Sequence, residues 1–99
     1  MKINITKTQR ARLVKEWLND MFSDVEIRGS YCVKNEKNLA FQNKKNKDFR
    51  FDYDLIWSFL ESIFSLEYEE LQAITKDWLD ETLNLKGYTT SYLRNLSWT

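Results

Sequence analysis

The chain has 99 residues and a mass of 12.0 kDa. That length supports one small domain, because two domains of about 50 residues would each be too small to close a core without disulfides or metals. Hydrophobic residues make up 42% of the chain and include four Trp, five Tyr and six Phe, so it has the core material that a disordered protein lacks. Histidine is absent and Cys32 is the single cysteine, which excludes an internal disulfide and the commonest general base.

The net charge of zero conceals an uneven distribution along the chain. Residues 1–50 hold twelve Lys or Arg against six Asp or Glu, which gives +6, and residues 51–99 hold three against nine, which gives −6. We expect one basic and one acidic region that guide encounters with partners, unless folding interleaves the two halves and they neutralise each other.

The first predicted element is a helix over about residues 6–23. Thr6 and Gln9 have the spacing of a capping box, in which each side chain bonds the backbone N–H of the other residue. Apolar residues then recur on one face of about four helical turns. They are Leu13, Val14, Trp17, Leu18, Met21 and Phe22.

Alternation with a period of two follows and predicts a three-stranded antiparallel meander. The first strand covers about residues 25–34, with Gly29 as a bulge, and the others cover about 39–42 and 49–53. A turn at residues 35–38 and a polar loop at 43–48 connect them.

Two helices are predicted next, over about residues 54–64 and 66–85. Asp54 or Asp52 can cap the first, whose apolar residues cover so wide an arc that we expect it to be central and largely buried. Ser65 can cap the second, which is amphipathic and stops at Gly87.

The tail from residue 88 to 99 is expected to hold one more helical turn, which Thr90 and Ser91 would cap. The prediction is a single α+β domain over residues 1–99, in the order α-β-β-β-α-α, with helices packed on the sheet.

Catalysis is disfavoured, and we expect a protein that is not an enzyme and needs no cofactor or metal. The nearest approach to a nuclease pattern is Asp24-Val25-Glu26-Ile27-Arg28, where Arg28 stands in the position of the usual lysine. Cys32 has no histidine to activate it, which favours a structural thiol. Gly29 and Gly87 are too far apart to form a phosphate-binding loop.

The most distinctive feature is the acidic character of the two later helices. Between Asp54 and Leu85 there are eight Asp or Glu and one Lys, a local charge of −7. Most of these carboxylates fall in an arc of roughly 120° opposite the apolar stripe of the second helix. Either they are an ordinary solvated face, or they bind a partner protein with a basic nucleic-acid groove. The candidate partner-binding residues are Glu67, Glu69, Glu70, Asp77, Asp80 and Glu81.

These features resemble the small anti-CRISPR proteins of phages and prophages that inhibit Cas9. The resemblance spans roughly residues 1–85 and is carried by Met1-Lys2-Ile3-Asn4, by the helix from Asp54 to Phe64 and by Glu67-Tyr68-Glu69-Glu70. It implies a phage-type accessory protein in the cytoplasm of a bacterial host, where it would act as a DNA mimic. Its acidic helices would occupy the basic groove of Cas9 with its guide RNA. Reversing Glu70, Asp77 and Glu81 to lysine is then expected to abolish inhibition.

Two other functions remain open. The first is a small DNA- or RNA-binding regulator that uses Lys44, Lys45, Lys47 and Arg50, with Phe41 or Phe49 stacking on bases. Against it, lysines in a hairpin also keep a protein soluble and protect sheet edges. The second is a structural homo-oligomer, such as a homodimer, that docks through the tail. The tail residues concerned are Tyr92, Leu93, Leu96 and Trp98.

No run of apolar residues approaches the roughly 18 that a membrane span requires, and the start of the chain has no stretch like a signal peptide. We therefore expect a cytoplasmic protein without a membrane partner.

Overall fold

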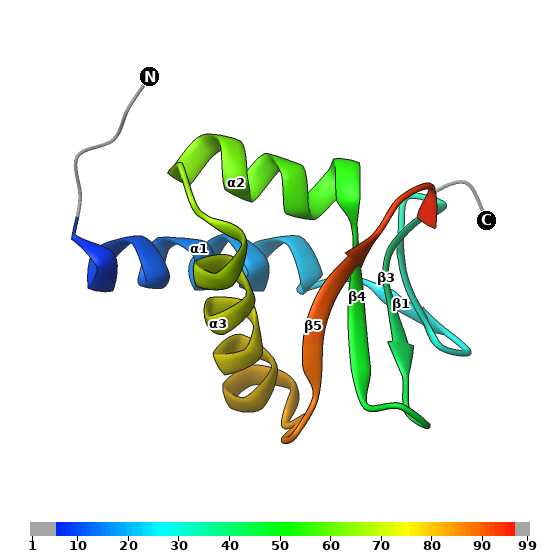
Figure 1. Ribbon diagram of the computed structural model, residues 1–99. Coiled ribbons are helices and arrows are strands. Elements are labelled where there is room, and N and C mark those ends of the chain that lie inside the picture. The colour runs from blue at the N-terminus through cyan, green and yellow to red at the C-terminus, as the bar shows by residue number, and fades with distance from the viewer. Residues whose placement is uncertain (1–5, 97–99) are drawn as a thin grey trace.

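A computed structural model describes residues 6–96 of the chain (Figure 1). Helix α1 (Lys7–Phe22) begins at the predicted capping box. The hydroxyl of Thr6 accepts from the backbone N–H of Gln9 at 3.2 Å, and the Gln9 side chain accepts from that of Thr6 at 3.1 Å. The apolar stripe of α1 faces the core through Val14, Leu18 and Phe22, so the prediction for this helix is confirmed.

Five strands form one sheet in the order β1-β2-β3-β4-β5, and the prediction of three strands is wrong in number. The predicted first strand is two strands, β1 (Glu26–Arg28) and β2 (Tyr31–Lys34). Gly29 lies between them with a φ of +61°, so it makes a hairpin turn and not a bulge. The strands β3 (Lys37–Asn43) and β4 (Asp48–Asp52) complete the antiparallel part.

The fifth strand, β5 (Thr89–Leu93), lies parallel to β4 at the edge of the sheet. It replaces the helical turn predicted from Thr90, and Trp98 lies outside the described residues. Helix α3 (Tyr68–Trp78) fixes this strand, since the buried hydroxyls of Thr75 and Thr90 lie 2.7 Å apart. The side-chain amide of Gln72 also donates to the Thr90 carbonyl at 2.9 Å.

The later helices begin and end differently from the prediction. They are the π-helical turn η1 (Tyr53–Trp57), α2 (Ser58–Phe64), α3 (Tyr68–Trp78) and the π-helical turn η2 (Leu79–Leu83). Asp52 is the residue that caps η1, because its carboxylate accepts from Leu55 N at 2.8 Å. Ser65 ends α2 with a φ of +52° instead of capping α3, and Asn84, with a φ of +56°, ends η2 before Gly87.

The three helices cover one face of the sheet, and the β1–β2 and β3–β4 hairpins extend past them (Figure 1). Phe49 and Phe51 of β4 are 1% and 0% exposed and pack against Phe22 and Trp78. The radius of gyration is 12.9 Å, which matches the roughly 13 Å of a single compact domain of 100 residues. The molecule is therefore one α+β globule with a single core.

Helix α2 is less buried than its sequence predicts. Ile56 and Leu60 are fully buried, but Phe59 is 41% and Ile63 is 42% exposed. Phe59 instead stacks on Trp17 of α1, with ring centroids 5.1 Å apart. The apolar residues of this wide arc therefore pack against two different surfaces, the core and the outer side of α1. None of the helices within residues 6–96 is long and apolar enough to cross a membrane.

Removing the Asp52 carboxylate is expected to destabilise the fold. Asp52 is fully buried and caps η1, so Asp52→Ala should lower the free energy of unfolding by about 1–2 kcal/mol. Asp54→Ala is the matched control, because Asp54 is exposed two residues further on and should stay within about 0.5 kcal/mol of wild type. Urea unfolding followed by tryptophan fluorescence measures both, and equal losses would contradict the assigned cap.

Candidate functional site

The six candidate carboxylates do not all face solvent freely, because helix α1 neutralises two of them. The Arg10 guanidinium donates to Glu70 Oε2 from Nε at 3.1 Å and from Nη2 at 2.5 Å. The ammonium group of Lys15 lies 3.1 Å from both carboxylate oxygens of Glu81. Glu70 and Glu81 therefore connect α3 and η2 to α1, and their charge is compensated within the molecule.

The Arg10–Glu70 pair is the more enclosed of the two, with side chains that are 18% and 24% exposed. Charge-assisted hydrogen bonds of this kind are stronger than those of exposed pairs, because less water competes for the ions. In the Lys15–Glu81 pair the Glu81 side chain is 62% exposed, so solvent screens it more. The first pair is thus mainly a structural contact between α1 and α3.

The other four candidates, at positions 67, 69, 77 and 80, are exposed. No Lys or Arg among the described residues lies within 4.0 Å of their carboxylates. Glu69 and Asp77 are eight residues apart on α3, about 12 Å at the rise of an α-helix, and Asp80 follows in the first turn of η2. We call Glu67, Glu69, Asp77 and Asp80 the acidic ridge. Lys76 is exposed on the same helix and partly offsets it.

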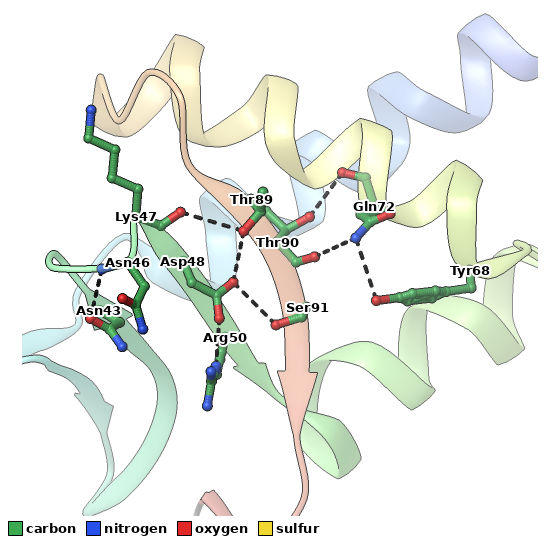
Figure 2. Close-up of polar contacts among 10 residues, drawn as sticks. All are labelled: Asn43, Asn46, Lys47, Asp48, Arg50, Tyr68, Gln72, Thr89, Thr90 and Ser91. Atoms are coloured by element: carbon green, nitrogen blue, oxygen red, sulfur yellow. Dashed lines mark hydrogen bonds and ion pairs between the residues drawn. The ribbon is translucent and has the colours of Figure 1, made fainter.

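The candidate cations belong to the β3–β4 hairpin, and Figure 2 shows how its loop is fixed. The side chain of Asn43 accepts from Asn46 N at 3.2 Å, and Lys47 takes a left-handed φ of +51°. The Lys47 carbonyl accepts from Thr89 N at 2.9 Å, which joins the loop to the start of β5. The side chains of Lys44, Lys45 and Lys47 are left exposed.

Asp48 is the polar centre of this region (Figure 2). One of its carboxylate oxygens accepts from the hydroxyls of Thr89 and Ser91, at 3.1 and 3.4 Å, and the other accepts from Arg50 Nε at 2.6 Å. Arg50 is therefore partly neutralised, in contrast to the three loop lysines. Phe49 is 1% exposed and cannot stack on a base, whereas Phe41 is half-buried and remains accessible.

The tail residues predicted to dock onto a neighbour are not one surface. Leu96 is 2% exposed, and its carbonyl accepts from the Asn38 side chain at 3.1 Å, so it belongs to its own fold. Tyr92 and Leu93 are 36% and 39% exposed on β5. Tyr92 packs against Tyr53, with ring centroids 4.8 Å apart.

The residues of the weak nuclease pattern are held by ion pairs. Asp24 lies 3.0 Å from Lys34 Nζ, and Glu26 lies 2.9 Å from Arg28 Nη2. The hydrogen bond and the positive charge of Arg28 hold the pKa of Glu26 below its ordinary value, so this carboxylate stays ionised. Within residues 6–96, no three His, Cys, Asp or Glu side chains come together as a metal site.

Comparisons with protein-family models, with curated proteins and with solved structures find no match to this chain. The function of this chain must therefore be inferred from the geometry of its two charged surfaces.

Neutralising Glu70 is expected to destabilise the fold, because it leaves Arg10 without its partner. Glu70→Gln should lower the free energy of unfolding by about 1–3 kcal/mol. Glu69→Gln removes the same charge one residue earlier, from an exposed position, and should change it by less than about 0.5 kcal/mol. Chemical unfolding of both variants tests this prediction, and a loss for Glu69→Gln as large as that for Glu70→Gln would contradict it.

Cys32 is expected to be unreactive in the folded protein. The thiol is 5% exposed, and its burial raises its pKa from 9.0 to about 11. At pH 8 the folded protein should therefore hold roughly a hundredfold less thiolate than the unfolded chain. Iodoacetamide labelling at pH 8, with and without urea, measures the difference. Equal labelling rates in the two conditions would show that the thiol is accessible.

Proposed function

We propose that this chain is a non-enzymatic inhibitor that binds a host protein which handles nucleic acid. The target proposed is a CRISPR nuclease of the Cas9 type that carries its guide RNA. The acidic ridge would enter the basic groove that otherwise receives DNA, so the chain would act as a DNA mimic.

One observation carries this proposal: the four carboxylates of the acidic ridge are exposed and have no cation partner among the described residues. A row of fixed negative charges attracts a basic groove at long range and pairs with its Lys and Arg side chains at contact. The ion pairs of Glu70 and Glu81 support the same reading, because they hold the helix that presents the row. A preorganised row loses less conformational entropy on binding than one on a flexible segment.

A nucleic-acid-binding regulator is the second candidate, and a different observation favours it. Lys44, Lys45 and Lys47 are exposed together on one hairpin loop, and none pairs with a carboxylate of the described residues. This surface is separate from the acidic ridge, so the two functions are tested by different variants.

The ion pairs change which substitutions test the inhibitor proposal. Reversal of Glu70 or Glu81 would place a lysine beside Arg10 or Lys15 and so confound binding with stability. Asp77→Lys combined with Asp80→Lys avoids this, since both carboxylates are exposed and unpaired with any described cation. We expect this double variant to need roughly tenfold or more protein to inhibit cleavage of a target duplex by purified Cas9 with its guide RNA.

The matched control is Glu16→Lys combined with Asp20→Lys. These carboxylates are also exposed on a helix, and their reversal changes the net charge by the same amount. The one ion pair that is lost, Glu16 with Arg12 at 4.0 Å, is exposed to solvent and contributes little to stability. The control should inhibit as wild type does, and thermal melting should show that both double variants are folded. Absence of inhibition by the wild-type chain, or equal inhibition by both double variants, would contradict the proposal.

A further inference from the structure

A row of side chains crosses the face of the sheet that none of the helices within residues 6–96 covers. The strand register places Arg28 opposite Tyr31, Tyr31 opposite Phe41, and Phe41 opposite Arg50. Residues directly opposite each other in neighbouring strands point to the same face of a sheet. These four side chains therefore share one face, and we call them the outer row.

The burial of β4 identifies that face as the outer one. Phe49 and Phe51 are buried against the helices, so Arg50 between them must point to the opposite side. The helices lie on only one side of the sheet (Figure 1). Part of this face is covered, since Asp52, two residues after Arg50, is fully buried. The outer row itself is accessible to a ligand, because Arg28 is exposed and the other three side chains are half-buried.

Two accessible rings occupy the centre of this row. Tyr31 and Phe41 are each only half-buried, and their rings meet edge to face with centroids 5.1 Å apart and an interplanar angle of 84°. An open hollow of about 300 Å³ lies beside Tyr31, at the lower end of the range of small-ligand sites. Arg28 and Glu36 line the same hollow.

The two ends of the outer row differ in charge: Arg28, at one end, is neutralised by ion pairs, and lysines that pair with no described carboxylate lie beyond the other end. Arg28 is paired with Glu26 at 2.9 Å and with Glu36 at 3.3 Å, so it offers little net charge. On the other side, the strand that carries Phe41 leads directly into the loop of Lys44, Lys45 and Lys47. The ion pair of Arg50 with Asp48 is made through Nε, at 2.6 Å.

We propose that the outer face of the sheet binds single-stranded nucleic acid. Unpaired bases would stack on Tyr31 and Phe41, and the phosphates would lie against the loop lysines. Stacking favours a single strand over a duplex, because the bases of a duplex already cover one another's faces. Every base has such a face, so little sequence preference is expected. This surface does not include the acidic ridge, so the inference does not depend on the proposed inhibition. It rests on the second candidate function, the nucleic-acid-binding regulator, and adds the class of ligand and the rings that bind its bases. Tighter binding of the duplex would contradict this inference alone, whereas no binding of any probe would contradict both.

The test is fluorescence anisotropy with labelled 12-nucleotide oligo-dT and oligo-U and with a DNA duplex of the same length. Wild-type protein should bind both single strands more tightly than the duplex, with an affinity that falls steeply between 50 and 200 mM salt. Tyr31→Leu combined with Phe41→Leu should reduce the affinity for the single strands roughly tenfold or more. The two single-stranded probes distinguish DNA from RNA as the source of the ligand.

Tyr68→Leu combined with Phe59→Leu is the matched control. These rings are 36% and 41% exposed on the helical side, so their loss should leave the affinity unchanged. Lys44→Gln combined with Lys45→Gln should weaken binding and flatten the salt dependence. Circular dichroism and thermal melting establish that each variant is folded. No binding by the wild-type protein, tighter binding of the duplex, or unchanged affinity after loss of Tyr31 and Phe41 would overturn the proposal.

Discussion

The alternation of side chains along β4 determines how the rest of the molecule is arranged. Phe49 and Phe51 are the aromatic residues of this strand, which lies between β3 and β5, and both must be removed from water. The three helices supply the apolar surfaces that cover them, and all lie on that one side (Figure 1). Asp48 and Arg50 consequently point away from the helices, to a face of the sheet on which Arg50 is half-buried and Asp52 is buried.

The same packing determines which charges remain available. Helix α1 lies against α3, and its Arg10 and Lys15 meet the carboxylates on the near edge of the acidic helix. The expectation of one basic and one acidic region is therefore met only in part. The basic first half of the chain and the acidic second half interleave along the α1–α3 contact. Two groups of exposed, unpaired charge among the described residues bear on function: the acidic ridge, which runs from Glu67 through α3 into η2, and the three lysines on one hairpin.

Local patterns in the sequence predicted the elements that local interactions determine. The capping box of α1 needs only Thr6 and Gln9, and Asp52, one of the two predicted caps, bonds a backbone N–H three residues away. Strand β5 was missed because Thr90 and Ser91 suit a helix cap as well as a strand. The choice between them depends on Thr75 of α3 and on pairing with β4, which are distant in sequence.

The same distinction applies to the candidate site: features set by neighbouring residues could be predicted, and features set by residues distant in sequence could not. Exposure of the loop lysines follows from their place in a polar hairpin loop, and the structure has them exposed. The partner of Glu70 is 60 residues away in sequence, which no helical periodicity can reveal. A single strand over residues 25–34 would place Tyr31 on the same face as Ile27, but the turn at Gly29 breaks that alternation. The register across β1, β2 and β3 then places Tyr31 with Arg28 and Phe41.

The separation of the two surfaces limits what kind of partner can engage both. The acidic ridge lies on the helical side of the molecule, and the outer row lies on the opposite face of the sheet. On the helical side the acidic ridge would repel the phosphates of a nucleic acid, and on the other side the loop lysines would repel a purely basic protein. A partner that contacts both surfaces at once must therefore offer a cationic groove together with unpaired bases, and must reach around the edge of the sheet. A protein that carries its own single-stranded nucleic acid has that combination of chemistry, whereas either component alone can match only one side.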